Sequence, residues 1–316
     1  MSALALLRTP PPRVAVEFTA RHVAAVALEG RTSAAARVAA HAVEPLAEGA
    51  LVPALNAPNL GRRDEVVSAV RRAFSTLGLK PRRVGLVLPD ASAKVSFVRF
   101  DTLPARTSDL EEMIRFQVRK AAPFRIEDSQ VAHCPAAAAS GGHEFVVVQA
   151  RRDIVAEYEG VCQAAGAMAG IVELATLSVV NAALAADGPS DGDWLLIHTS
   201  ADAASLVIMR GHAPVFFRHR GADGDGHLAE LVHQTAMYYQ DRLGGSGFSR
   251  VLVSGRLPDD RASGGRSALE ARLRVSIAPV DPTRAVPLAD RAAPARDLVD
   301  ALTPAIGLSM AMRGAP

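Results

Sequence analysis

The stretch RVAVEFTARHVAAVAL, residues 13–28, consists of two short apolar segments around a polar turn. This pattern predicts a β-hairpin, and a third strand follows at about residues 35–43. The later part of the chain repeats the order, because WLLIHT (194–199), SLVIMRG (205–211) and APVFFRHR (213–220) are also apolar strands joined by short turns. Two meanders of three strands predict a duplicated α/β architecture.

Each meander is followed by a helix and a single apolar strand. After the first meander, an apolar stripe predicts a helix at 63–77, and VGLVLP (84–89) has the continuous apolar character of a strand buried on both faces. After the second meander, the same signals occur at 227–243 and 250–255. The Gly-, Pro- and Asp-rich stretch ADGPSDGD, at 186–193, marks the boundary between the two halves.

The first half contains additional elements between residues 94 and 174. Their order is strand, helix, strand, strand, helix, strand, which predicts an α+β unit. The clearest helix signal is the segment at 108–118, where Ser108 and Glu111 have the spacing of a capping box.

Composition excludes several classes of protein. The chain has 316 residues with 35 basic and 33 acidic side chains, a formal net charge of +2, so no overall field favours binding to nucleic acid. Cys134 and Cys162 provide neither a disulfide framework nor a zinc site, which favours a reducing cytoplasm. We expect no membrane-spanning segment, and we expect residues 1–12 to be a flexible lead.

Two halves of this kind resemble the duplicated ribonuclease-H-like core of the actin, sugar kinase and Hsp70 superfamily. The added unit resembles the insertion of the cell-division protein FtsA and the pilus protein PilM. Segments similar to the PilM family in order and character are VGLVLPDASAKVSFVRFDTLP (84–104), SDLEEMIRFQVRKAAPF (108–124), VVVQARRDIVAEYEGVCQAAG (146–166) and LTPAIGLSMAMR (302–313).

The resemblance implies a division into domains. Residues 13–91 and 173–188 would form the first actin-like domain, and residues 92–172 would form the inserted α+β subdomain. Residues 189–316 would form the second actin-like domain.

Actin-like proteins hold ATP phosphates in two hairpin turns, in which glycines let backbone N–H groups approach the phosphate and an aspartate positions hydrated Mg²⁺. The resemblance places other residues at these positions. It therefore implies a degenerate nucleotide site without a functional cofactor, with weakly bound ATP and Mg²⁺ as the alternative. The site would contain Glu17 and Thr19 from the first turn, His198 and Ser200 from the second, and Gly255 and Arg256 from the adenosine side.

The resemblance also implies an adaptor of the type IV pilus assembly platform. Such a protein would lie in the cytoplasm, peripheral to the inner membrane, and would bind the cytoplasmic tail of a PilN-like membrane protein. Further partners would be other platform or motor components, or a second copy of the chain. We expect the strand at 95–100 and the helix at 110–118 to frame the groove, although these residues are equally suited to a core. The candidate contacts are Val95, Phe97, Arg99, Met113, Phe116 and Gln117.

Two other functions stay open at this point. One is an ATP-binding actin-like switch, and the other is a GspL-like component of a type II secretion platform, which has the same fold.

Weaker signals favour ordinary structural roles. Asp223 and Asp225 resemble the start of a calcium loop without its later acidic ligand, and His227 and His233 have a poor spacing for a metal. Cys162 lies on an apolar helix stripe, which favours packing. The sequence also contains an arginine cluster, which consists of Arg71, Arg72, Arg82 and Arg83. This cluster is either a solvated face or a contact for anionic lipid or a partner.

Overall fold

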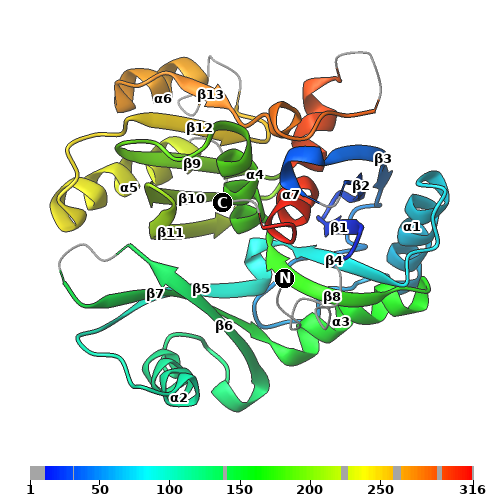
Figure 1. Ribbon diagram of the computed structural model, residues 1–316, viewed down its shortest axis with the longest axis horizontal. Helices are drawn as coiled ribbons and strands as arrows, with labels where there is room; N and C mark the ends of the chain where they lie inside the picture. Colours follow the sequence, from blue (N-terminus) through cyan, green and yellow to red (C-terminus); the bar gives the residue numbers. More distant parts are fainter. Residues whose placement is uncertain are drawn as a thin grey trace.

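Three β-sheets form the framework of the computed structural model (Figure 1). Two sheets have five strands each, and the third has three. The structure describes residues 11–30, 32–137, 141–221, 227–258, 265–289 and 294–314.

The first sheet contains the hairpin at the start of the described chain. Its strand order is β3-β2-β1-β4-β8. The meander is antiparallel, whereas β4 runs parallel to β1 and β8 runs parallel to β4, because a longer connection precedes each of these strands. The strands are β1 (Val14–Phe18), β2 (His22–Glu29), β3 (Arg37–Pro45), β4 (Arg83–Leu88) and β8 (Met168–Leu174).

The second sheet has the equivalent order, β11-β10-β9-β12-β13, which confirms the duplicated actin-like architecture. Helices α5 (His227–Leu243) and α6 (Arg266–Leu273) bury Leu231 and Leu269 against the Leu195 face of this sheet. The strands are β9 (Asp193–Thr199), β10 (Ala203–Arg210), β11 (Ala213–Gly221), β12 (Arg250–Ser254) and β13 (Ile277–Pro279).

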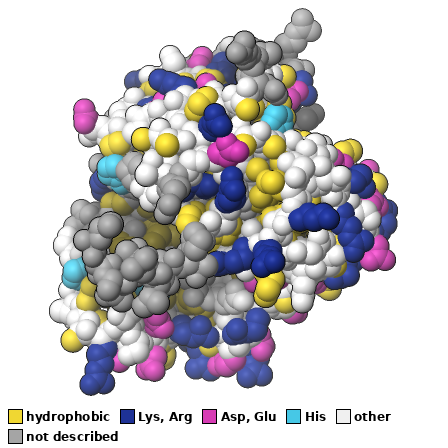
Figure 2. All heavy atoms as spheres, turned by 45° about the vertical axis from the view of Figure 1, so that its right-hand side comes forward, with side chains coloured by type: hydrophobic (Ala, Val, Ile, Leu, Met, Phe, Trp, Pro, Cys, Tyr) yellow, Lys and Arg dark blue, Asp and Glu magenta, His cyan; other side chains and the backbone are white. Residues whose placement is uncertain are grey.

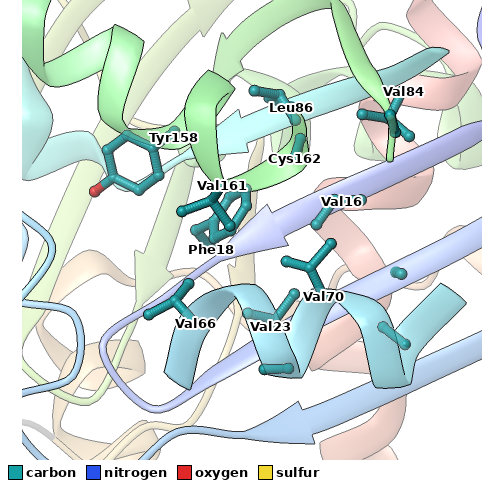
Figure 3. Packing of buried hydrophobic residues seen from close by; sticks show 14 of the residues in the cluster. Val16, Phe18, Val23, Val66, Val70, Val84, Leu86, Tyr158, Val161 and Cys162 are labelled. Carbon is teal, nitrogen blue, oxygen red and sulfur yellow. The ribbon is translucent and has the colours of Figure 1, made fainter. Parts of the chain in front are cut away.

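The core of the first half lies between its sheet and the helices α1 (Arg63–Thr76) and α3 (Arg152–Ala164) (Figure 3). The rings of Phe18 and Tyr158 meet edge to face there, with centroids 5.3 Å apart. Cys162 is fully buried in this core, and burial raises the pKa of its thiol to about 12. This agrees with a packing role for the cysteine.

The third sheet has the order β5-β7-β6 and lies outside the duplicated core. Helix α2 (Thr107–Val118) covers one of its faces, where Ile114 and Val118 pack with Val98 and Val147. The strands are β5 (Ala93–Phe100), β6 (Ser129–Ala136) and β7 (His143–Arg151).

The start of α2 differs from the expected capping box. The helix begins at Thr107, and its N-cap residue is Arg106, which makes no side-chain capping hydrogen bond. The hydroxyl of Ser108 donates instead to the carboxylate of Asp109, at 3.1 Å. Ser108 is therefore already inside the helix, and the capping box is wrong.

Strand β8 is part of the first sheet, and helix α3 packs against that sheet. β8 hydrogen-bonds to β4, and α3 packs in the same core as Phe18. The sequence-based division assigned residues 92–172 to the inserted subdomain. The pattern of helices and strands does not specify which sheet a strand joins, because that depends on long-range pairing.

The last helix of each half packs against the sheet of the other half (Figure 1). Helix α4 (Ala175–Asp187) closes the first half, and it buries Val179 against the Trp194 face of the second sheet. Helix α7 (Arg296–Ala311) closes the second half and buries Ile306 against β1 and β2 of the first sheet. The two helices therefore complete cores that neither half completes with its own elements.

Helices α4 and α7 also touch each other closely. A methyl group on Gly307 of α7 would lie 1.8 Å from the carbonyl oxygen of Ser178 and 2.7 Å from its carbonyl carbon. Backbone atoms cannot move aside as a flexible side chain does. This contact requires glycine at position 307.

We predict that Gly307→Ala lowers the free energy of unfolding by about 1–3 kcal/mol, because the added methyl group forces the two helices apart. Gly160→Ala in α3 is the matched control, since its methyl group would lie 3.7 Å from the nearest atom outside the helix backbone and its two chain neighbours, a guanidinium nitrogen of Arg63. The control variant gains up to about 1 kcal/mol from helix propensity. Urea unfolding measures both. Equal stability of the two variants would contradict the proposed contact.

Candidate functional site

A cleft of about 470 Å³ lies where the two halves meet. The turns of both hairpins line it, together with the short 3-10 turn Asp90–Ser92 that follows β4, the loop after β12, and α7. Strands β1 and β4 are parallel and end at the same edge of their sheet, and ligands of such sheets bind at the carboxyl ends. The cleft is therefore the candidate site.

In the first hairpin turn, two backbone N–H groups donate hydrogen bonds to a side chain of the same turn. The N–H groups of Arg21 and His22 donate to the hydroxyl oxygen of Thr19, at 3.2 and 2.9 Å. The hydroxyl of Thr19 in turn donates to the carbonyl of His22, at 2.9 Å. An anion at this turn would have to displace Thr19 from both N–H groups.

Glu17 lies at the end of β1 and faces the cleft. Its side chain is 3 % exposed, and its Oε2 has no hydrogen-bond partner among the residues that the structure describes. Burial raises the pKa of Glu17 well above its ordinary value of 4.5, and the nearby charge of Asp90 raises it further. The protonated form of this side chain is thus favoured, and a protonated carboxyl is a poor ligand for Mg²⁺.

Asp90 is a buried carboxylate that connects the two halves. It accepts hydrogen bonds from the hydroxyl of Thr176 and from the N–H of Thr176, at 3.1 Å, in the first turn of α4. It also accepts one from the hydroxyl of Ser205 on β10, at 2.7 Å. These donors compensate the burial of the charge.

Ser205 lies in a row of polar residues across the second sheet. Strand pairing places it opposite His198 on β9 and His219 on β11, and its hydroxyl is 2.9 Å from Nδ1 of His219. Burial lowers the pKa of both histidines, although the charge of Asp90 acts in the opposite direction. Neutral imidazoles at this position give no positive charge to hold a phosphate.

The loop after β12 packs directly on the second hairpin. The hydroxyl of Thr199 donates to the carbonyl of Arg256, at 2.9 Å. Gly255 has φ of +94°, and a methyl group there would lie 2.1 Å from the carbonyl oxygen of Thr199. The glycine is therefore required for contact between protein segments, independent of any ligand.

Helix α7 contributes acidic side chains to the cleft. Asp297 and Asp300 both line it. Burial raises the pKa of Asp300, although the ion pair with Arg296 and the N–H of Gly255 lower it. Acidic residues here add negative potential to a site that, in an actin-like nucleotide binder, would face a polyphosphate.

The two hairpin turns also meet across the cleft. Arg21 and Asp202 form an ion pair of 3.6 Å, with side chains 52 % and 54 % exposed. An exposed pair of this kind contributes little to stability, so the buried Asp90–Ser205 hydrogen bond is the stronger connection.

A family model described as type IV pilus assembly protein PilM matches residues 15–242. The chain belongs to this PilM family. The match includes both hairpins and all strands of the third sheet. No curated protein sequence matches the chain.

Solved structures give the same fold for this PilM-family protein. One, described as the PilM-PilN type IV pilus biogenesis complex, matches with a TM-score of 0.78 and 18 % identity, over 98 % of this chain and all of that one. Another is the cytoplasmic domain of EpsL, an inner-membrane component of the type II secretion system of Vibrio cholerae. It matches with a TM-score of 0.50 and 12 % identity, over 78 % of this chain and 83 % of that one.

The six residues expected to form a degenerate nucleotide site all line the cleft of this PilM-family protein. They are Glu17, Thr19, His198, Ser200, Gly255 and Arg256. Their assignment to a nucleotide stays a prediction.

The sequence-based analysis missed polar residues of the cleft, and four of them show why. One of them had a usable signal, because Asp90 directly follows the buried strand at 84–89 and so lies at the carboxyl end of a parallel strand. The others depend on strand register or on the position of α7. They are Ser205, His219 and Asp300.

The expected partner-binding residues do not come together in one groove. Val98 and Phe100 of β5 pack against Leu110 and Ile114 of α2, so the space between strand and helix is filled. Alternate residues of a strand face opposite sides. Val95, Phe97 and Arg99 therefore lie on the sheet face away from α2, whereas Met113, Phe116 and Gln117 are exposed on the outside of the helix.

The described residues contain neither a candidate metal site nor a candidate membrane-spanning helix. In the described ranges, no group of three His, Cys, Asp or Glu side chains is arranged to hold a metal ion. None of the helices there combines the length and apolar character needed to cross a bilayer. Asp223, Asp225 and the side chain of His227 lie outside the described residues.

We predict that Glu17→Gln raises Tm at pH 8 and that the gain shrinks as the pH falls toward 5. A carboxyl with a raised folded-state pKa binds its proton more tightly in the folded protein, so wild-type stability is full below the ordinary pKa of 4.5 and falls as pH rises. Glutamine does not ionise, so the variant does not lose stability at this position as the pH rises. Thermal unfolding across this pH range measures the difference.

Glu29→Gln is a control of opposite sign, because a hydrogen bond from Arg37 lowers the pKa of Glu29. That variant gains no stability at pH 8. A constant Tm difference between Glu17→Gln and wild type at all pH values would refute the account of Glu17.

Proposed function

We propose that this PilM-family protein is a scaffold of the type IV pilus assembly platform, which binds the cytoplasmic tail of a PilN-like membrane protein and does not hydrolyse ATP. The supporting observation is the family match over residues 15–242, together with the shared fold of the PilM-PilN complex over nearly the whole of both chains. Through such a partner the protein would be held in the cytoplasm at the inner membrane. Contacts with other platform or motor components, and self-association, are part of this proposal.

The chemistry of the cleft supports a role without ATP. A magnesium nucleotide needs free turn amides and an ionised carboxylate near the metal. Here Thr19 occupies the amides of Arg21 and His22, and burial favours the protonated form of Glu17. These two features support a cleft that does not hold a magnesium nucleotide.

Direct contacts between the halves also support a scaffold. In a nucleotide-dependent switch, the ligand would contact both hairpins and hold the two halves together. In this protein Asp90 and Ser205 join the halves through a buried hydrogen bond, and Arg21 of the first hairpin forms an ion pair with Asp202 of the second. Contacts between protein groups thus hold the two halves together at the cleft. Partner binding would then depend on the fixed shape of the protein and not on a bound nucleotide.

The outer face of α2 is the surface that we propose for the tail. Met113 and Phe116 are three residues apart on this face, with 37 % and 77 % of their surfaces exposed, and Gln117 is exposed beside them. A largely exposed phenylalanine on a helix is a suitable anchor for an apolar segment of a partner. Val95, Phe97 and Arg99 are not part of this surface.

The two alternatives have less support. The contacts of Thr19 and Asp90 described above support a scaffold over an ATP-dependent switch. The cytoplasmic domain of EpsL shares the fold at a lower TM-score, and the family model matches the pilus protein. A pilus platform is the better-supported role.

We predict that Mg²⁺ with ATP does not change the Tm of the protein. A specific ligand at about 100 times its Kd would add about 2.7 kcal/mol to the free energy of unfolding. For a chain of this size that corresponds to a rise in Tm of roughly 4 °C. A magnesium-dependent rise of this size with ATP, absent with Mg²⁺ alone, would instead support the nucleotide switch.

We predict that a synthetic peptide of the PilN-like cytoplasmic tail binds the full chain without nucleotide, and that Phe116→Ala weakens this binding by about tenfold or more, which corresponds to about 1.4 kcal/mol. Isothermal calorimetry measures the affinity. Met237→Ala is the matched control, because Met237 is 44 % exposed on another helix, α5. Absence of peptide binding would refute the adaptor role, and equal effects of the two variants would refute the assignment to α2.

A further inference from the structure

A basic surface with apolar side chains lies at the end of the first sheet opposite the cleft. We call it the basic patch and define it as Arg13, Lys80, Arg82 and Arg83 with Leu79 and Met168. The patch surrounds the amino ends of β1, β4 and β8, whereas the cleft lies at the carboxyl ends of β1 and β4. The proposed function uses none of these residues.

Strand pairing brings the residues of the patch together. Val14 pairs with Val84, so Arg13, which directly precedes β1, lies near Arg83, the first residue of β4. Arg83 itself pairs with Met168, and the N–H of Met168 donates to the carbonyl of Arg82, at 2.9 Å. Residues of three separate segments thus form one surface.

The charges of the patch are not neutralised within the protein. Arg13, Lys80, Arg82 and Arg83 are exposed, and none forms an ion pair with a residue that the structure describes. Glu29 interacts with Arg13, but Arg37 already binds it at 2.8 Å.

The segments that build the patch contain no acidic residue. Asp and Glu are absent from residues 1–16, 66–89 and 160–172. Figure 2 shows one face of the molecule, on which Lys and Arg side chains lie near exposed hydrophobic atoms, together with some Asp and Glu side chains. The local positive charge therefore exceeds what the overall net charge of +2 indicates.

Apolar side chains are exposed among these cations. Met168 is 67 % exposed and Leu79 is 40 % exposed. Pro12, directly before Arg13, lies beside Gly170 of β8 and so joins these two segments.

We propose that the basic patch binds the surface of an anionic membrane. Cations beside exposed apolar side chains suit a lipid headgroup region, where the charges attract phosphates and the apolar groups enter the interface. Nucleic acid is less well matched, because the patch lacks the aromatic side chains on which bases stack. This contact goes beyond the proposed adaptor function, since it places the protein on the membrane by a surface distinct from α2.

The test is sedimentation of the full chain with lipid vesicles. We expect binding to vesicles with about one third phosphatidylglycerol, no binding to pure phosphatidylcholine, and loss of binding at about 0.5 M salt, where charges are screened. Arg82→Gln with Arg83→Gln weakens binding about 25-fold, because each cation near the surface contributes about 1 kcal/mol. Arg119→Gln with Arg125→Gln, a double change at exposed positions of the inserted unit, leaves binding unchanged.

Thermal unfolding confirms that each variant is folded. Equal binding to neutral vesicles, no binding to anionic vesicles, or equal loss in both double variants would overturn the proposal. Binding to polyglutamate or DNA but not to vesicles would also overturn it and would indicate a protein or nucleic-acid partner. The peptide measurement for α2 uses no lipid, so failure of one proposal is distinguishable from failure of the other.

Discussion

The close contact between α4 and α7 is the constraint on which the rest of the structure depends. Gly307 allows the two helices to approach until a methyl group would overlap the carbonyl of Ser178. Each helix covers the sheet of the other half, so this contact fixes both cores relative to each other. The width of the cleft and the distance between the two hairpin turns follow from it.

Within this frame, a few polar residues determine the character of the cleft. Asp90 takes donors from both halves, and the hydroxyl of Thr19 binds the amides of its own turn. Both arrangements satisfy groups that an actin-like nucleotide binder leaves for its ligand. The same fold can therefore serve a protein that holds partners, because function resides in the site and not in the architecture.

The sequence predicts the duplicated fold well, because alternating apolar strands and helix stripes are local signals. Glu17 and His198, expected at a degenerate nucleotide site, both line the cleft, because each is the last but one residue in the first strand of its meander. The sequence does not predict Ser205 or His219 there, because cross-strand register decides which side chains meet. The position of α2 on β5 depends likewise on long-range packing, which is why the expected groove is filled.

The exchange of helices has a consequence for biosynthesis. The first sheet emerges from the ribosome long before residues 296–311, the helix that covers the face formed in part by Ala15 and Val26. Until residues 296–311 have been synthesised, that face stays open to water and to other nascent chains. The first sheet is therefore fully packed only after α7 has been made, so a ribosome that stalls earlier in the second half yields a product with an exposed apolar sheet.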